Sequence, residues 1–201
     1  MKNYVVRFIN DNYKGIIVLG LCLLIGLTLG LISFSFFNEQ LKLEFVNNVK
    51  STFQLAKSDG FEGINILKNA MLINLLMVLL FVFIAITIIA PIIYSGLFFL
   101  KGFSLGVYMS IILNIFGFGK GILSILLLII LPNLIYLPVF IYVGIQFINT
   151  HYIIIGTEQK SKIGAIISLG ISMLIAFSIF LISILLEQNL IPVAINMYVA
   201  S

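Results

Sequence analysis

Apolar residues occur in long blocks along this chain, separated by short polar stretches. A helix needs roughly 20 mostly apolar residues to cross about 30 Å of hydrocarbon. Five segments meet that length, so the pattern predicts five transmembrane helices: 16–37, 71–90, 92–116, 121–148 and 163–186. The first is too long, and lacks a convincing small-residue cleavage site, to be a signal peptide that is removed.

Proline divides the longest apolar block. Residues 71–118 are too many for one span, and Pro91 disrupts helical hydrogen bonding and disfavours helix in the residue before it. We therefore predict a helix boundary at Pro91. The fourth predicted helix contains Pro132 and Pro138, each of which removes one backbone donor. This helix is expected to be kinked, either as a structural feature or as a break that lines a solute path.

One polar segment, 38–70, is long enough to hold structure of its own. Apolar side chains recur every four residues in its first half, at Leu41, Phe45, Val49 and Phe53. This spacing predicts an amphipathic helix, followed by a turn at 58–60. The apolar face of that helix either rests on the outer membrane surface or receives a partner protein.

The composition indicates that lipid is the natural solvent of this chain. Of 201 residues, 62% are hydrophobic and 9% are charged, and the mean hydropathy is +1.24. A water-soluble domain carries about 25% charged residues. We therefore expect 1–201 to form one all-α domain, a polytopic integral membrane helix bundle in a bacterial cell membrane. The formal charge of +4 is scattered, and no stretch alternates aromatic and basic residues, which argues against nucleic-acid binding.

The distribution of lysine and arginine predicts the orientation. With the N-terminus inside, six basic residues fall on the inner side: Lys2, Arg7, Lys14, Lys101, Lys160 and Lys162. Five fall on the outer side: Lys42, Lys50, Lys57, Lys68 and Lys120. The tail after Leu186 carries none. This favours an N-inside, C-outside arrangement, with Tyr13, Tyr94 and Tyr152 near the inner interface.

Few residues are suited to catalysis or metal binding. All seven carboxylates lie in loops or at predicted helix ends. Cys22, the single cysteine, is expected to be an apolar packing residue, and His151, the single histidine, stands alone at a helix end as an interfacial polar residue. No phosphate-binding loop of the GxxxxGK[ST] kind is present. We therefore expect no enzymatic activity, no metal site and no cofactor.

Small residues occur at helical spacing inside two of the predicted spans. Gly26 and Gly30 are four apart in the first, and Gly102, Gly106 and Ser110 repeat at the same spacing in the third. Residues four apart share a helix face, and glycine there lets two backbones approach closely in lipid. These faces can pack within the chain, against a partner protein or in a homo-oligomer, and the sequence leaves that choice open.

Two polar residues inside predicted spans are more informative. Lys101 lies about ten residues into the third helix, where a lysine at the bilayer centre would cost about 2.5–3.5 kcal/mol on insertion scales. Either the helix begins near Lys101 or its side chain reaches the inner surface, or it belongs to a functional site that faces the protein interior. Asn133, between Pro132 and Pro138, carries an amide that is expected to need partners from neighbouring helices.

The order of these motifs resembles the stage II sporulation protein M family. The resemblance rests on three stretches within residues 90–150: Phe99-Leu-Lys-Gly-Phe-Ser-Leu-Gly106, Gly117-Phe-Gly-Lys-Gly121, and Leu131-Pro-Asn-Leu134 with Pro138 following. Overall size, a five-span layout and an extracytoplasmic loop after the first span also agree with that family. The positions that match its motifs are Lys101, Gly102, Gly106, Gly117, Gly121, Pro132, Asn133 and Pro138.

The resemblance implies a non-enzymatic membrane scaffold in endospore formation. Members of this family sit in the septal and engulfing membranes and recruit two partners, the stage II sporulation proteins D and P, which degrade peptidoglycan. A second hypothesis comes from a different class: a small transporter or permease component that uses Lys101 and a broken fourth helix. A wet cavity lined by Lys101 and Asn133 would favour transport.

Overall fold

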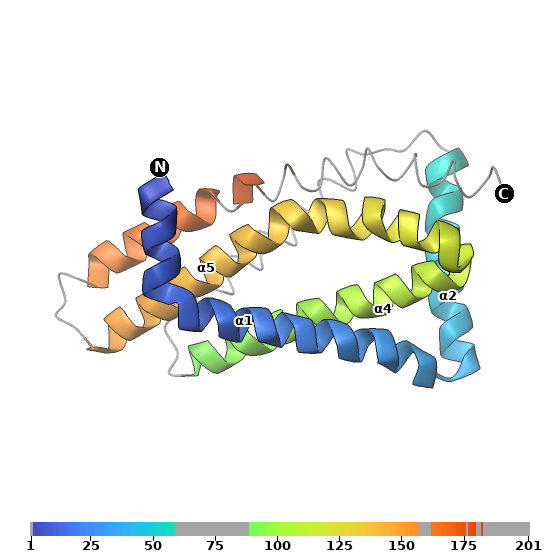
Figure 1. Cartoon of the computed structure of the whole chain (residues 1–201), viewed down its shortest axis with the longest axis horizontal. Coiled ribbons are helices and arrows are strands. Elements are labelled where there is room, and N and C mark those ends of the chain that lie inside the picture. Colours follow the sequence, from blue (N-terminus) through green and yellow to red (C-terminus); the bar gives the residue numbers. More distant parts are fainter. Residues whose placement is uncertain (1, 59–88, 157–161, 176, 180–181, 183–201) are drawn as a thin grey trace.

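The computed structural model of the chain describes residues 2–58, 89–156, 162–175, 177–179 and 182, with side chains of 2–5 and 52–58 excluded. These residues form α1 (Lys2–Phe36), α2 (Glu39–Ser58), α4 (Ala90–Ile125), the π-helix η1 (Leu126–Ile130) and α5 (Leu131–Gly156), as Figure 1 shows. A further helical segment, Lys162–Ile179, follows. No strand occurs within these described ranges, so the predicted all-α class is confirmed there.

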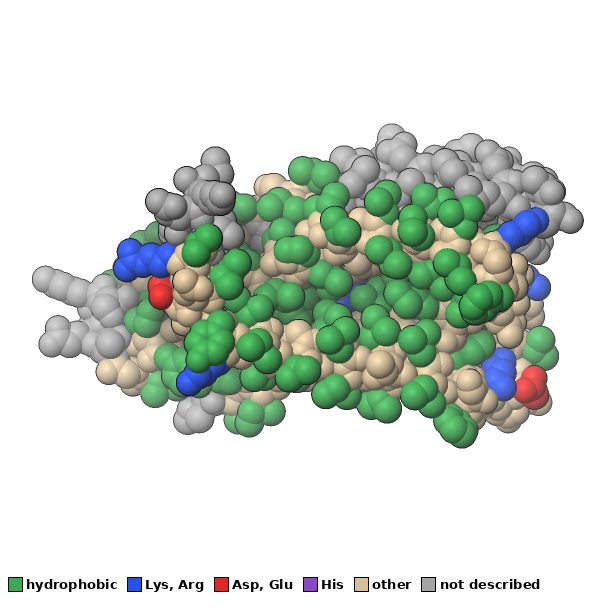
Figure 2. All heavy atoms as spheres, in the orientation of Figure 1, with side chains coloured by type: hydrophobic (Ala, Val, Ile, Leu, Met, Phe, Trp, Pro, Cys, Tyr) green, Lys and Arg blue, Asp and Glu red, His purple; other side chains and the backbone are tan. Residues whose placement is uncertain are grey.

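Three helical stretches are long and apolar enough to cross a membrane: Val6–Phe36, Ala90–Gly156 and Lys162–Ile179. Figure 2 shows hydrophobic side chains along the length of the molecule, with most charged side chains gathered at its two ends. One end carries the first turns of α1 and the start of Lys162–Ile179, and the other carries α2 and the turn at Gly117. This distribution is compatible with a membrane location.

The helix α1 begins earlier than predicted, at Lys2 instead of residue 16. Its first turns are polar but still helical. The Asn12 side-chain amide donates to the Phe8 carbonyl at 2.9 Å, and the Arg7 Nε atom lies 3.7 Å from the Asp11 Oδ2 atom one turn away. Hydropathy identifies the apolar part of a helix. The helical hydrogen bonds of α1 also include the polar residues that precede this part. The predicted apolar span, 16–37, therefore falls on the later part of a longer helix.

The helix α4 begins where proline predicted a boundary. Pro91 occupies the first turn, where its missing N–H is not needed, and the N–H groups of Ile92 and Ile93 both donate to the Ile89 carbonyl at 3.1 Å. The predicted third helix, 92–116, agrees with α4 up to a kink at Gly117. The predicted second helix, 71–90, lies almost entirely outside the described residues.

Gly117 makes the turn between the third and fourth predicted helices. Its φ of 71° and ψ of 177° break the helical path inside α4, which therefore consists of two helices joined at this residue. Four residues later, a Cβ on Gly121 would lie 3.0 Å from the Leu113 side chain, so the two helices meet closely beyond the turn. The predicted break between the segments 92–116 and 121–148 is therefore observed, at Gly117.

Replacing Gly117 by alanine is expected to destabilise the chain by about 1–2 kcal/mol, because an L side chain at positive φ approaches its own backbone. Gly119→Ala is the matched control, since Gly119 has a helical φ and no described atom within 4 Å of an added Cβ. Thermal unfolding in detergent compares the two variants. Equal midpoints would contradict the turn at Gly117.

The fourth predicted helix is interrupted by a wide π-turn. In η1, the N–H of Leu131 donates to the carbonyl of Leu126, five residues back, immediately before the buried Pro132. Local π geometry is one way in which a transmembrane helix accommodates the groups that proline disturbs. Pro138 lies inside α5, which bends in Figure 1 and continues to Gly156, eight residues beyond the predicted end.

The amphipathic helix is observed as α2, and the residue that it buries most deeply against the bundle is not one of the four on the predicted apolar stripe. Val46 is 6% exposed and contacts Phe34 of α1 and Ile111 of α4, whereas Leu41 and Phe45 are 47% and 41% exposed. Of the four predicted residues, Val49 packs against the bundle and the Phe45 ring stacks on Phe37 with the ring centroids 6.0 Å apart, while the Phe53 side chain lies outside the description. Figure 1 shows α2 crossing the end of the bundle at a steep angle to α1 and α4.

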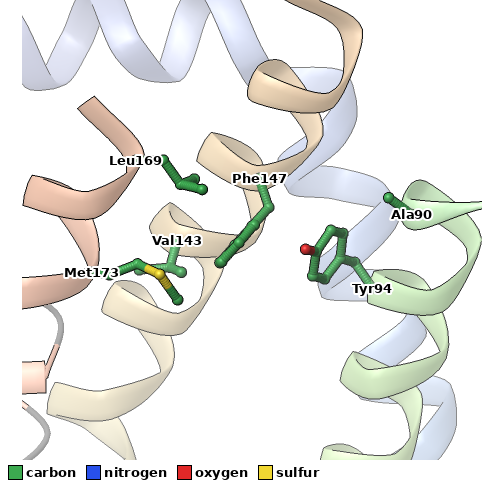
Figure 3. Close-up of a cluster of buried hydrophobic side chains, with 6 residues drawn as sticks. All are labelled: Ala90, Tyr94, Val143, Phe147, Leu169 and Met173. Carbon is green, nitrogen blue, oxygen red and sulfur yellow. The ribbon is translucent and has the colours of Figure 1, made fainter. Parts of the chain in front are cut away.

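At the opposite end, the Lys162–Ile179 segment joins the bundle through an apolar cluster. Figure 3 shows Leu169 and Met173 of this segment near Val143 of α5, while Phe147 of α5 faces Tyr94 of α4. The Tyr94 and Phe147 ring centroids are 4.9 Å apart. Tyr94 is 2% exposed, so its side chain lies inside the bundle, in the first turns of α4.

Candidate functional site around Lys101

The two glycine faces pack against each other within the chain. A Cβ on Gly26 or Gly30 of α1 would strike the backbone carbonyl of Phe99 or Phe103 of α4. Reciprocally, a Cβ on Gly102 or Gly106 would strike a carbonyl of α1; those carbonyls belong to Leu23 and Leu27. The glycines therefore bring the two backbones into direct contact.

A hydrogen bond extends this contact by one turn. The Ser110 hydroxyl donates to the Leu31 carbonyl across the interface at 3.1 Å. Such interhelical bonds add about 0.6 kcal/mol on average within a membrane. The sequence left the partner of these faces open, and the structure assigns the described faces to an intramolecular pair. Lys101 immediately precedes Gly102, so it lies on α4 beside this contact.

Lys101 lies in the middle of a helix. It is eleven residues from the start of α4 and fifteen from Phe116, or about 16 Å and 22 Å at 1.5 Å per residue. The suggestion that the third helix begins near Lys101 was therefore wrong. If α4 crosses the membrane, this half-buried ammonium lies near mid-depth in a core about 30 Å thick.

The ammonium of Lys101 lies over an aromatic ring of α5. Its Nζ atom is 4.9 Å from the centroid of the Tyr136 ring. A cation over the face of an aromatic ring is stabilised by about 0.5–2 kcal/mol, more as water is excluded. This contact offsets part of the insertion penalty of the lysine. Sequence reasoning selected Lys101 and missed Tyr136, although Tyr136 lies between the two prolines and three residues after Asn133.

An aromatic stack positions Tyr136. The Tyr136 ring stacks on Phe140 at 5.3 Å, and Phe140 stacks on Phe98 at 4.3 Å. Phe98 is 1% exposed and lies one turn before Lys101 on α4. A Cβ on Gly144 would come within 2.9 Å of the Phe98 ring, so the ring fills the space that this glycine leaves. The stack connects the Lys101 site to the core of the bundle.

Asn133 finds a partner in its own helix. Its side-chain amide donates to the Ile129 carbonyl at 2.7 Å. The expectation that this amide needs a neighbouring helix was therefore wrong. Pro132 is buried beside η1, and Pro138 is exposed. The structure thus brings Tyr136 to Lys101, and it gives Asn133 and Pro132 local roles in the irregular turn.

A crevice between α4 and α5 is lined by apolar and aromatic side chains: Tyr94, Leu97, Phe98, Phe140, Val143, Gly144 and Phe147. Neither Lys101 nor Asn133 is among its lining residues. This crevice is therefore not the wet cavity, lined by Lys101 and Asn133, that would favour transport. It shares Phe98 and Phe140 with the stack beneath the lysine.

Polar side chains also join helices near the first turns of α1. Asn149 of α5 donates to the Asn12 side-chain oxygen at 2.9 Å, and the Tyr142 hydroxyl lies 3.5 Å from the Ser172 hydroxyl. His151, near the end of α5, is 4% exposed, so its side chain is buried within the bundle. Cys22 packs beside the cluster of Leu19, Leu23, Phe98 and Ile145, as expected. Within the described ranges, no three His, Cys, Asp or Glu residues are grouped to hold a metal.

No known protein family, no curated protein and no solved structure matches this chain.

Proposed function

We propose that this chain is a non-enzymatic, multi-pass membrane scaffold of the stage II sporulation protein M type. In this proposal it recruits the peptidoglycan-degrading stage II sporulation proteins D and P to the septal and engulfing membranes. The observation that carries the proposal is that polar side chains within the apolar helices contact other parts of this chain. Lys101 lies over Tyr136, Asn133 bonds its own helix, and Ser110 bonds α1.

The residues that match the family motifs lie at the contact with α1, at the Gly117 turn or beside the π-turn. Gly102 and Gly106 contact α1, Gly117 and Gly121 form the hairpin, and Pro132 follows the π-turn. These residues specify the α4–α5 hairpin and its attachment to α1. In this proposal, family members that share these residues in the same order build the same hairpin.

Connectivity supports five spans. The helix α1 ends beside α2 at one end of the bundle, and α4 starts at the other end. The intervening chain must return over that distance, and its residues 71–88 contain no charge. A crossing there, together with α1, α4 up to Gly117, the remainder through α5, and Lys162–Ile179, makes five.

The proposed orientation is N-inside and C-outside. Lys101 lies in mid-helix and is therefore not counted among the basic residues on the inner side. Five basic residues remain on each side. The lysines and arginines inside lie closer together along the chain, with Lys2, Arg7 and Lys14 in the first turns of α1. In this orientation α2 lies on the outer surface, with Leu41 and Phe45 available to lipid.

Transport is the second candidate, because a lysine at mid-depth beside an interrupted helix is a feature of solute pathways. Solute flux in vesicles containing the full chain would support it, provided that Lys101→Ala abolishes the flux. That result would contradict a purely scaffolding role.

Co-purification tests the scaffold. The tagged chain is isolated from sporulating cells in mild detergent, and the eluate is assayed for peptidoglycan degradation and for its protein content. We expect a cell-wall hydrolase to co-elute. The Gly102→Leu variant, which forces α1 from α4, should lose the hydrolase, and Gly96→Leu should retain it because no described atom lies within 4 Å of a Cβ there. Recovery of the chain alone would contradict the proposal.

A further inference from the structure

The first turns of α1 leave the line of the bundle. Figure 1 shows them at a steep angle to the rest of α1, which runs along the length of the molecule with α4. They lie at the end of the bundle where the Lys162–Ile179 segment begins. If the long helices cross the membrane, the first turns of α1 therefore run close to the membrane plane, at its surface.

One face of these turns packs against α5. The ring centroids of Phe8 and Tyr142 are 5.0 Å apart, and Asn149 donates to the Asn12 side-chain oxygen at 2.9 Å. Phe8 and Asn12 are four residues apart and share a face of the helix. These contacts hold the first turns against the bundle, and they leave the other faces of the helix uncovered.

A second face is apolar and exposed. Val6, Ile9 and Tyr13 are each about half exposed, and their spacing of three and four residues places them on one side of the helix. Tyr152, in the last turns of α5 at the same end of the bundle, is also exposed. Exposed tyrosines at one end of a helical bundle are typical of the interface between lipid and water.

Basic side chains flank this apolar face. Arg7 and Lys14 are seven residues apart, so they share a neighbouring face of the helix. The Lys14 Nζ atom lies 6.0 Å from the centroid of the Tyr13 ring. Arg7 pairs with Asp11, but both side chains are exposed, and an exposed pair of this kind contributes little to stability. The guanidinium can therefore also contact an anion at the membrane surface.

The charge of the chain is concentrated on this side. In the proposed orientation the inner side holds five basic residues against Asp11 and Glu158, a balance of +3. The outer side holds five basic residues against five acidic ones, a balance of 0, and Lys101 supplies the remaining +1 of the formal +4. The acidic residues on the outer side are Glu39, Glu44, Asp59, Glu62 and Glu187. An anionic surface is therefore the partner that complements the first turns of α1.

We propose that the first turns of α1 form an interfacial helix that binds anionic phospholipid headgroups. Val6, Ile9 and Tyr13 enter the boundary of the acyl chains, while Arg7 and Lys14 contact lipid phosphates. Helices that lie in the interface bind through their buried apolar area together with attraction to anionic lipids. This lipid contact goes beyond the proposed scaffold function, and it does not require a partner protein.

Fluorescence quenching in vesicles tests the lipid contact. The chain contains no tryptophan, so Tyr13→Trp places a single reporter on the apolar face. The full chain is reconstituted in phosphatidylcholine with a minor share of phosphatidylglycerol, and the acyl chains of one lipid at a time carry bromine. We expect phosphatidylglycerol to be enriched about fivefold beside the reporter, which corresponds to about 1 kcal/mol of attraction.

Charge variants assign the enrichment to the first turns of α1. In the Tyr13→Trp chain, Arg7→Gln combined with Lys14→Gln should remove it. Lys42→Gln combined with Lys120→Gln removes the same charge from the other end of the bundle and should leave the enrichment unchanged. Size exclusion and circular dichroism verify that the variants remain folded. Equal quenching by the two lipids, or an enrichment that survives the loss of Arg7 and Lys14, would overturn the proposal.

A reporter at the opposite end completes the test. Phe36→Trp places the tryptophan at the exposed end of α1, where Lys42 donates to Glu39 at 3.0 Å. We expect little enrichment there, because positive and negative charges balance on that side. The same enrichment at both ends would indicate attraction by the overall charge of the chain and would overturn the assignment to the first turns. Failure of a hydrolase to co-purify would contradict the scaffold function and leave this lipid contact standing.

Discussion

Replacing Gly102 by leucine should separate α1 from α4 and lower the stability of the chain by more than about 3 kcal/mol. Overpacking of a core typically costs about 1–3 kcal/mol because neighbouring side chains can move aside. At Gly102 the first obstacle is the Leu23 carbonyl, which belongs to the backbone of α1. Relief therefore requires a shift of the whole helix. The same reasoning applies to Gly26, which faces the Phe99 carbonyl.

Thermal unfolding in detergent, followed by size exclusion, measures this effect. A loss of about 3 kcal/mol corresponds to a midpoint lowered by roughly 6–12 °C for a chain of this size. Gly96→Leu on α4 and Gly20→Leu on α1 are the matched controls, because an added Cβ at either position meets no described atom within 4 Å. If Gly102→Leu and Gly96→Leu unfold together, α1 and α4 do not meet at their glycines.

Replacing Phe98 by alanine should have the second-largest effect, about 3 kcal/mol. Core Phe→Ala changes cost about 3–5 kcal/mol in water-soluble proteins, as the sum of a transfer part and a cavity part. Lipid also solvates an aromatic ring, so the transfer part shrinks and the cavity part remains. Phe98 is 1% exposed, stacks on Phe140 and fills the space over Gly144, so its cavity is not readily closed.

Phe118→Ala is the control for this prediction, since Phe118 is 80% exposed and the same atoms are removed. The Phe98 variant should also loosen the stack that supports Tyr136. Unfolding midpoints that are equal for Phe98→Ala and Phe118→Ala would show that the stack contributes little.

Lys101 shows how far sequence reasoning reaches into the candidate site. A charge in an apolar block is visible in any hydropathy profile, because burial of an ammonium in hydrocarbon is costly wherever it occurs. Its partner is not visible in the same way. Tyr136 reaches Lys101 because the Gly117 turn reverses the chain and the stack of Phe140 on Phe98 fixes the two helices in register.

The helix α2 shows the same limit. Its period correctly predicted a helix, and Leu41 and Phe45 of the predicted stripe remain exposed, but the buried contact is made by Val46, which the spacing did not select. An apolar stripe on a helix at a membrane surface can face lipid or protein equally well. The close position of Phe34 and Ile111, contributed by α1 and α4, decides which part of the stripe is covered.

By itself, the sequence determined the helical class, the lengths of the apolar blocks and the breaks at Pro91 and Gly117. These features follow from local physics, because each helix satisfies its own backbone hydrogen bonds, and proline and glycine interrupt them locally. Only the tertiary structure decided which faces meet. Apolar faces gain little by leaving lipid for one another, so the contact between Gly26 and Gly102 and the place of Lys101 depend on packing and shape.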